Sequence, residues 1–163
     1  MVLGRDDAWA GYERMVVEID CCEQPIVVRP DRSGRAGEWP WPGVRPVHIL
    51  TAWDPGKSRP GLEVNRRRQA RLEAELRPPA VTLWSARGAD PATGLRDEGV
   101  AVRGLDEEAV RALGARYGQD AIFSWSPPEW AIVECLGTRR VATGWALGPI
   151  ARDVPSQRGR GAP

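Results

Sequence analysis

Several residue types that carry chemistry in proteins are almost absent from this sequence. Its 163 residues include a single histidine, His48, and three cysteines, of which Cys21 and Cys22 are adjacent. One histidine and no CxxC spacing leave no recognisable zinc motif, and an odd cysteine count makes a poor disulfide framework. No run approaches the roughly 20 apolar residues that a membrane-spanning helix needs. We therefore expect a protein with no metal, no cofactor and no membrane association.

A strong charge of one sign is also lacking, since the formal net charge is +1. No overall field therefore draws the chain to nucleic acid. The arginines between residues 66 and 71 share their segment with Glu63, Glu73 and Glu75, so we interpret them as a mixed-charge face rather than a nucleic-acid site. The polar run 5–7 stands where a secretory signal would be apolar, which favours the cytoplasm.

The sequence does contain a clear succession of short apolar runs and turn signals. Residues rich in β-formers predict a hairpin at 15–19 and 26–29, and further strands at 47–53, 81–85, 100–103, 121–125, 130–136 and 140–145. Helical periodicity predicts helices at 62–76 and 106–117, after a weakly helical lead-in at 1–13. The order β-α-β-β-α-β-β from residue 47 predicts an α+β fold. Its two helices pack on one face of a mainly antiparallel sheet, a ferredoxin-like βαββαβ core with added hairpin strands.

This succession of elements predicts a single domain with a long loop and a tail. We expect residues 1–150 to form one α+β domain and residues 151–163 to be disordered. The segment 30–46 is dense in Gly, Pro, Arg and Trp and predicts a long loop. Its Trp39 and Trp41 either fold back as a lid or form an exposed patch for a protein partner. The sequence leaves both alternatives open.

The predicted helix 62–76 carries polar residues on its apolar side. In projection, Asn65 and Gln69 fall on the same side as Leu62, Leu72 and Leu76. Burying an amide without partners costs on the order of a few kcal/mol, so both side chains need bonding partners or an open cleft. Either they bond the preceding loop, residues 51–58, or they face a ligand beside it.

Three motifs give the chain a resemblance to a known family. They are Thr51-Ala52-Trp53-Asp54-Pro55-Gly56, then Asn65 with Arg68-Gln69, then Tyr117-Gly118-Gln119-Asp120-Ala121-Ile122. In this order they resemble the bacterial family catalogued as domain of unknown function 3293, over roughly residues 12–145. The family typically has Asn at the positions of Asp54, Gln69 and Asp120, Glu at that of Val64, and an acidic residue before the central strand, here Asp97 or Glu98. The family name carries no activity, so the resemblance implies a fold and motif positions only.

The polar residues of these motifs define the predicted site. We expect them to converge at one edge of the sheet as a small-molecule pocket, with a nucleotide-like or otherwise anionic ligand as the leading hypothesis. Its residues are Asp54, Ser58, Asn65, Gln69, Asp97, Glu98 and Gln119. Were the protein an enzyme, a carboxylate base oriented by carboxamides is the chemistry that these residues permit. The alternative is a non-enzymatic protein-interaction or regulatory module, and the sequence leaves the question of catalysis open.

Overall fold

The computed structural model of the chain describes residues 5–148 except Lys57, with side chains from residue 8 onward. The predicted disordered tail, 151–163, lies outside these residues. The described part contains the helices α1 (Arg5–Arg14), α2 (Leu62–Glu75) and α3 (Glu107–Arg116). Its strands are β1 (Val16–Ile19), β2 (Ile26–Asp31), β3 (Val47–Leu50), β4 (Thr82–Ala89), β5 (Arg96–Arg103), β6 (Ala121–Ser126), β7 (Glu129–Glu134) and β8 (Arg140–Gly148).

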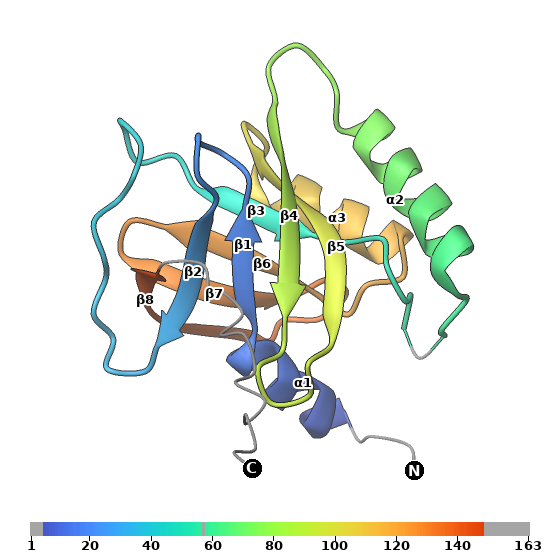
Figure 1. Cartoon of the computed structure of the whole chain (residues 1–163), viewed down its shortest axis with the longest axis horizontal. Coiled ribbons are helices and arrows are strands. Elements are labelled where there is room, and N and C mark those ends of the chain that lie inside the picture. The colour runs from blue at the N-terminus through green and yellow to red at the C-terminus, as the bar shows by residue number, and fades with distance from the viewer. Residues whose placement is uncertain (1–4, 57, 149–163) are drawn as a thin grey trace, which may run out of the picture.

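The strands form a closed antiparallel barrel. Their order around it is β1-β2-β8-β7-β6-β3-β5-β4, and β1 closes the ring by pairing with β4 (Figure 1). The closing pair sets Val16 opposite Ala89, and β2 joins β8 with Val27 opposite Gly148. These two pairings connect the N-terminal hairpin to both the middle and the end of the chain.

The barrel wall separates two apolar clusters. Strand side chains alternate between its two faces, so β3, β5, β6 and β7 contribute to both clusters. The inner cluster is rich in tryptophan and holds Val17, Ile19, Val28, Val47, Ile49, Ala86, Ala101, Trp125, Trp130 and Trp145. The outer cluster lies beneath α2 and α3 and includes Leu50, Leu72, Leu76, Val100, Val102, Val110, Leu113, Ile122 and Val133. Both helices therefore pack on the outside of the barrel (Figure 1).

The segments outside the wall strands cover the two ends of the barrel. At one end Trp41 stacks on Trp84, with ring centroids 5.1 Å apart and an interplanar angle of 9°, and Trp39 meets Trp125 at 4.8 Å. At the other end lies α1, anchored by the ion pair between Arg14 and Asp90 at 2.9 Å (Figure 1). We call this second end the α1 mouth.

The predicted two-layer α+β arrangement is wrong, because the sheet is not open. Helices α2 and α3 do cover one face of β3, β5 and β6, but the other face forms the inside of the barrel. In an open sheet with helices on one side, that second face would meet solvent. Here β1, β2, β7 and β8 bend round to bury it, so the predicted hairpin extensions are parts of a closed wall. The ferredoxin-like core is therefore replaced by an eight-stranded barrel.

Residues at both ends of α3 favour the bounds of this helix. Asp106 caps α3, its carboxylate accepting a hydrogen bond of 2.7 Å from the backbone N–H of Ala109. The helix ends at Gly118, which has a φ of 77°. This left-handed conformation favours glycine, because any other side chain there meets a steric penalty. Helix α2, in contrast, begins at Leu62 after Gly61, without a side-chain cap.

Candidate functional site

The predicted site residues Asn65 and Gln69 hold the loop that follows β3. The Asn65 amide donates to the Asp54 carboxylate at 2.8 Å and accepts from the Asp54 backbone N–H at 3.0 Å. The Gln69 side-chain oxygen accepts from the Ala52 N–H at 3.1 Å. Both carboxamides are nearly inaccessible, with 3% and 5% of their surface exposed. Of the two alternatives, the structure therefore shows the first: these amides bond the loop.

Two further motif residues complete this network. Arg68 donates to the Ala52 carbonyl at 2.9 Å and to the Tyr117 carbonyl. Gln119 donates to the Trp53 carbonyl at 2.9 Å. The loop is thus bonded through its N–H groups and its carbonyls alike, which is what buried backbone polar groups require. We call Asn65, Arg68, Gln69 and Gln119, with the loop 52–54 that they bond, the loop network.

The conformation of Asp54 fits its position in this network. Its φ is 41°, in the left-handed region that asparagine and aspartate enter more readily than most residues. A short side chain that can bond locally is therefore suited to this site. Arg59 donates to the outer carboxylate oxygen of Asp54 at 3.1 Å.

Two predicted site residues, Ser58 and Glu98, are exposed and lie outside the loop network. Ser58 is exposed, and only its backbone N–H bonds, donating to the Pro55 carbonyl at 3.0 Å. Glu98 is exposed as well, and its backbone carbonyl rather than its carboxylate accepts a hydrogen bond, from the Thr51 hydroxyl. Neither side chain has a hydrogen-bond partner within the described part of the chain.

Asp97 lies close to the loop network but is not bonded into it. It is half-buried on β5 and makes no hydrogen bond to any described residue. Burial raises the pKa of Asp97, the charge of Asp54 raises it further, and Arg59 opposes both effects. Burial also raises the pKa of Tyr12, on α1, to about 12, and the charges of Asp120 and Asp97 contribute. Asp97 is therefore an unbonded carboxylate at the α1 mouth.

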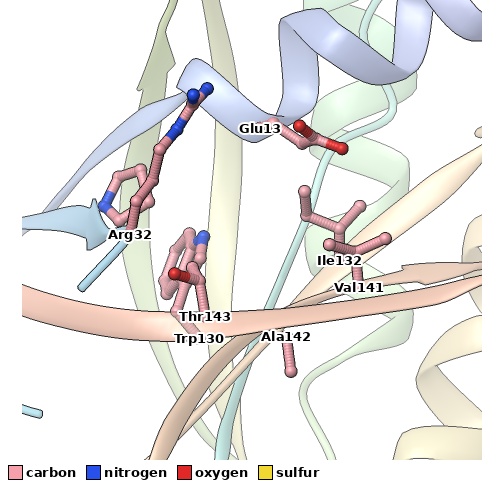
Figure 2. A pocket seen from close by; sticks show the side chains of 8 residues that line it. Glu13, Arg32, Trp130, Ile132, Val141, Ala142 and Thr143 are labelled. Atoms are coloured by element: carbon pink, nitrogen blue, oxygen red, sulfur yellow. The ribbon is translucent and has the colours of Figure 1, made fainter. Parts of the chain in front are cut away.

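The α1 mouth also holds a pocket of about 290 Å³ that the sequence did not reveal. Strand β2 ends at Asp31, which pairs with Gly144, so the first residues of β8 extend past it and leave a gap beneath α1. The walls come from α1, from the end of β2 and from β7 and β8 (Figure 2). The lining residues are Glu13, Pro30, Arg32, Trp130, Ile132, Val141, Ala142 and Thr143. We call this space the mouth pocket.

The mouth pocket combines an apolar wall with unsatisfied polar groups. The Trp130 side chain is only 1% exposed, and its ring N–H has no acceptor among the described residues. Figure 2 shows that ring nitrogen on the side of the strand that faces α1. Glu13 and Arg32 stand at the rim, and neither forms an ion pair with another described residue (Figure 2). No motif marks Glu13 or Arg32 in the sequence, so only the fold brings them together.

The structure also answers the question left open for the tryptophan loop. Trp39 and Trp41 are half-buried and pack against the inner cluster of the barrel. They therefore fold back onto the barrel instead of forming an exposed patch. Binding of a protein partner by this loop stays a prediction. The rings of Trp39 and Trp41 would offer such a partner little exposed surface.

Neither a candidate metal site nor a candidate membrane span occurs in the described residues. They contain no group of three or more His, Cys, Asp or Glu side chains placed to hold a metal ion. None of their helices is both long and apolar enough to cross a membrane. His48 lies buried on β3, where burial lowers its pKa while Glu107, Asp106 and the Leu105 carbonyl act in the opposite direction.

Comparison with known proteins identifies the segment that carries the loop network. No curated protein and no solved structure matches the chain. Residues 50–122 match the family described as "Protein of unknown function (DUF3293)", which confirms the resemblance drawn from the motifs. All four side chains of the loop network lie within this segment, whereas the residues lining the mouth pocket lie outside it. Over residues 50–122 the chain is thus similar to the DUF3293 family.

Proposed function

We propose that the protein binds a small molecule in the mouth pocket. The supporting observation is the Trp130 ring N–H, which is buried beside an open space and has no acceptor in the described chain. Leaving a buried donor unsatisfied costs about 1–3 kcal/mol. A ligand atom that accepts this hydrogen bond recovers that free energy. The ring N–H groups of Trp9, Trp39 and Trp125 also have no acceptor in the described chain, and Trp130 differs from them in lining this pocket.

The lining of the pocket indicates the chemistry of the ligand. Ile132, Val141 and the Trp130 ring offer an apolar wall of the kind that holds the body of a small molecule. The Arg32 guanidinium at the rim suits a carboxylate or a phosphate group. We therefore infer a compact apolar acid, which retains the anionic ligand expected from the sequence. We propose no reaction for this site.

The proposal can be tested with simple probes and one blocking substitution. Val141→Trp fills the pocket, because the Val141 side chain points into it (Figure 2). Ala142 also borders the pocket, but its methyl group points to the opposite face of β8, as strand alternation requires (Figure 2). Ala142→Trp is therefore the matched control. Thermal shift and calorimetry with benzoate, 2-naphthoate and hexanoate should show saturable binding to the wild type and to Ala142→Trp. Val141→Trp should abolish it.

Two outcomes would contradict small-molecule binding at this place. One is the absence of any saturable shift in the wild type at about 10 mM of every probe, a concentration at which even weak ligands occupy a site. The other is equal binding to Val141→Trp and Ala142→Trp, which would place the probe elsewhere. Arg32→Ala serves as a second test, since it should weaken the acids and leave a neutral analogue such as benzyl alcohol unaffected.

We also propose a reducing compartment such as the cytoplasm as the site of action. Cys21, Cys22 and Cys135 are all free thiols. Exposed thiols persist where glutathione and thioredoxin keep them reduced.

A further inference from the structure

A second hollow lies outside the barrel, between α2 and the end of α3. Its volume is about 280 Å³, and it is lined by Arg68, Arg71, Glu75, Arg116 and Tyr117. It shares no lining residue with the mouth pocket. Three guanidinium groups around one small space form an unusual concentration of positive charge for a chain whose net charge is +1. We propose that this hollow binds a phosphate dianion, either free or as a phosphate monoester.

Arg68 is held in place before any ligand arrives. Its Nε donates to the Ala52 carbonyl at 2.9 Å, and a second nitrogen donates to the Tyr117 carbonyl. Its guanidinium also lies 5.8 Å from the centre of the Tyr117 ring. A guanidinium has five N–H donors, so those not used by the carbonyls are available to an anion at little entropic cost.

The single carboxylate in the hollow is already satisfied. Glu75 accepts a hydrogen bond of 2.6 Å from the Tyr117 hydroxyl and is paired with Arg116. The hydrogen bond from Tyr117 lowers the pKa of Glu75, and the charge of Arg116 contributes. Glu75 therefore stays ionised and compensates one of the three arginines. The four charged groups sum to +2, which matches a phosphate dianion better than a single carboxylate.

Arg71 is the group left for the ligand. It makes no hydrogen bond and no ion pair with any residue in the described ranges. It lines the hollow together with Glu75 and Tyr117, and its charge adds to the effects of Tyr117 and Arg116 that lower the pKa of Glu75. Bidentate hydrogen bonds from guanidinium to phosphate are among the stronger polar contacts in proteins. Nucleic acid fits this surface less well, because Glu63 and Glu73 interrupt any longer basic track along α2.

Calorimetric titration with inorganic phosphate and with phenyl phosphate tests the site at constant ionic strength. Arg71→Ala removes the free guanidinium, and Arg66→Ala is the matched control. Arg66 has the same charge on the same helix, is exposed, and does not line the hollow. We expect Arg71→Ala to weaken phosphate binding about tenfold, the value of one charge-assisted contact, and Arg66→Ala to change it less than about twofold. Tighter binding of phenyl phosphate than of inorganic phosphate would assign the monoester, and the reverse order the free ion.

Two results would overturn the proposal. Equal weakening by Arg71→Ala and Arg66→Ala would mean that phosphate senses only the general charge of α2. No heat of binding with either anion at about 10 mM would mean that no such site exists. Thermal melts of both variants check folding, which we expect to be unchanged because both side chains are exposed. Binding of benzoate to Arg71→Ala reports separately on the mouth pocket.

Discussion

The loop network and the α1 mouth differ in whether their buried polar groups are hydrogen-bonded. In the loop network, Asn65, Gln69 and Gln119 all point inward, and each is bonded to backbone atoms of residues 52–54. At the α1 mouth, the Trp130 N–H and the Asp97 carboxylate are partly or fully buried and have no hydrogen bond within the described chain. The first region is therefore bonded within the chain, whereas the second holds polar groups that no described residue bonds.

This contrast changes how the family motifs are understood. Asn65, Gln69 and Gln119, which the sequence singled out as site residues, hold the loop 52–54 by hydrogen bonds. The loop network still acts on the α1 mouth electrostatically: burial raises the pKa of Asp97, and the charge of Asp54 raises it further.

The largest predicted effect comes from breaking the loop network. Asn65→Leu keeps the side-chain volume close but strands the Asp54 N–H and carboxylate, which lose two hydrogen bonds. We expect a loss of about 1–3 kcal/mol in the free energy of unfolding, measured by urea denaturation. Arg66→Leu, at an exposed position on the same helix, should change it by less than about 0.5 kcal/mol. A stabilising Asn65→Leu would show that the amide is kept for a ligand after all.

The sequence predicted this region well because its signal is local. Asn65 and Gln69 lie one turn apart on a helix, so a projection places them on the buried side, and the nearest loop offers bonding partners. The helices α2 and α3 were likewise predicted to within about a residue, because each depends on residues near in sequence, whereas the predicted strands 81–85 and 100–103 cover only about half of β4 and β5. The mouth pocket has no such signal, since Glu13, Arg32 and Val141 meet only when the barrel closes.

Closure itself is the step that sequence patterns could not supply. It depends on β1 pairing with β4, which are some 70 residues apart, as in the pair Val17 and Gly88. The sequence did contain one indication of closure. Strand β3 is buried at all four positions, and β5 contains the buried apolar run Val100-Ala101-Val102. Strands buried on both faces read as continuous apolar runs rather than as alternation. Such runs predict two-sided burial, although they do not tell which strands provide it.

A second prediction compares the same substitution beside the loop network, at the end of α3, and at the α1 mouth. Tyr117→Phe removes the hydroxyl that donates to Glu75 at 2.6 Å, and should cost about 1 kcal/mol. Tyr12→Phe, at the α1 mouth, removes a hydroxyl with no hydrogen-bond partner in the described chain and should be neutral or slightly stabilising. Urea melts of the two variants measure the difference. Equal losses would mean that the Tyr12 hydroxyl has a structural partner and that the contrast drawn here is false.

A third prediction concerns His48, a buried polar residue that lines neither pocket. Because burial lowers its pKa below the usual 6.5, the unfolded chain takes up a proton before the folded one does as the pH falls. Its contribution to stability is therefore complete above the unfolded pKa and is lost on acidification through the folded pKa. His48→Leu should show a shallower loss of stability below pH 6.5 than the wild type, in urea melts across that range. Parallel curves for the two proteins would refute a buried neutral imidazole.

The smallest effect on the free energy of unfolding is expected for Val141→Trp, a substitution that points into the mouth pocket. In a tightly packed core, replacing a valine by tryptophan overpacks the site and costs about 1–3 kcal/mol. Here the side chain points into a space of about 290 Å³, so the added ring has room and buries further apolar surface. We therefore expect a change in the free energy of unfolding of less than about 0.5 kcal/mol. Ile49→Trp, in the closed inner cluster, provides the contrast and should be strongly destabilising. If both substitutions destabilise alike, the mouth is as tightly packed as the core, and the pocket that supports ligand binding does not exist in solution.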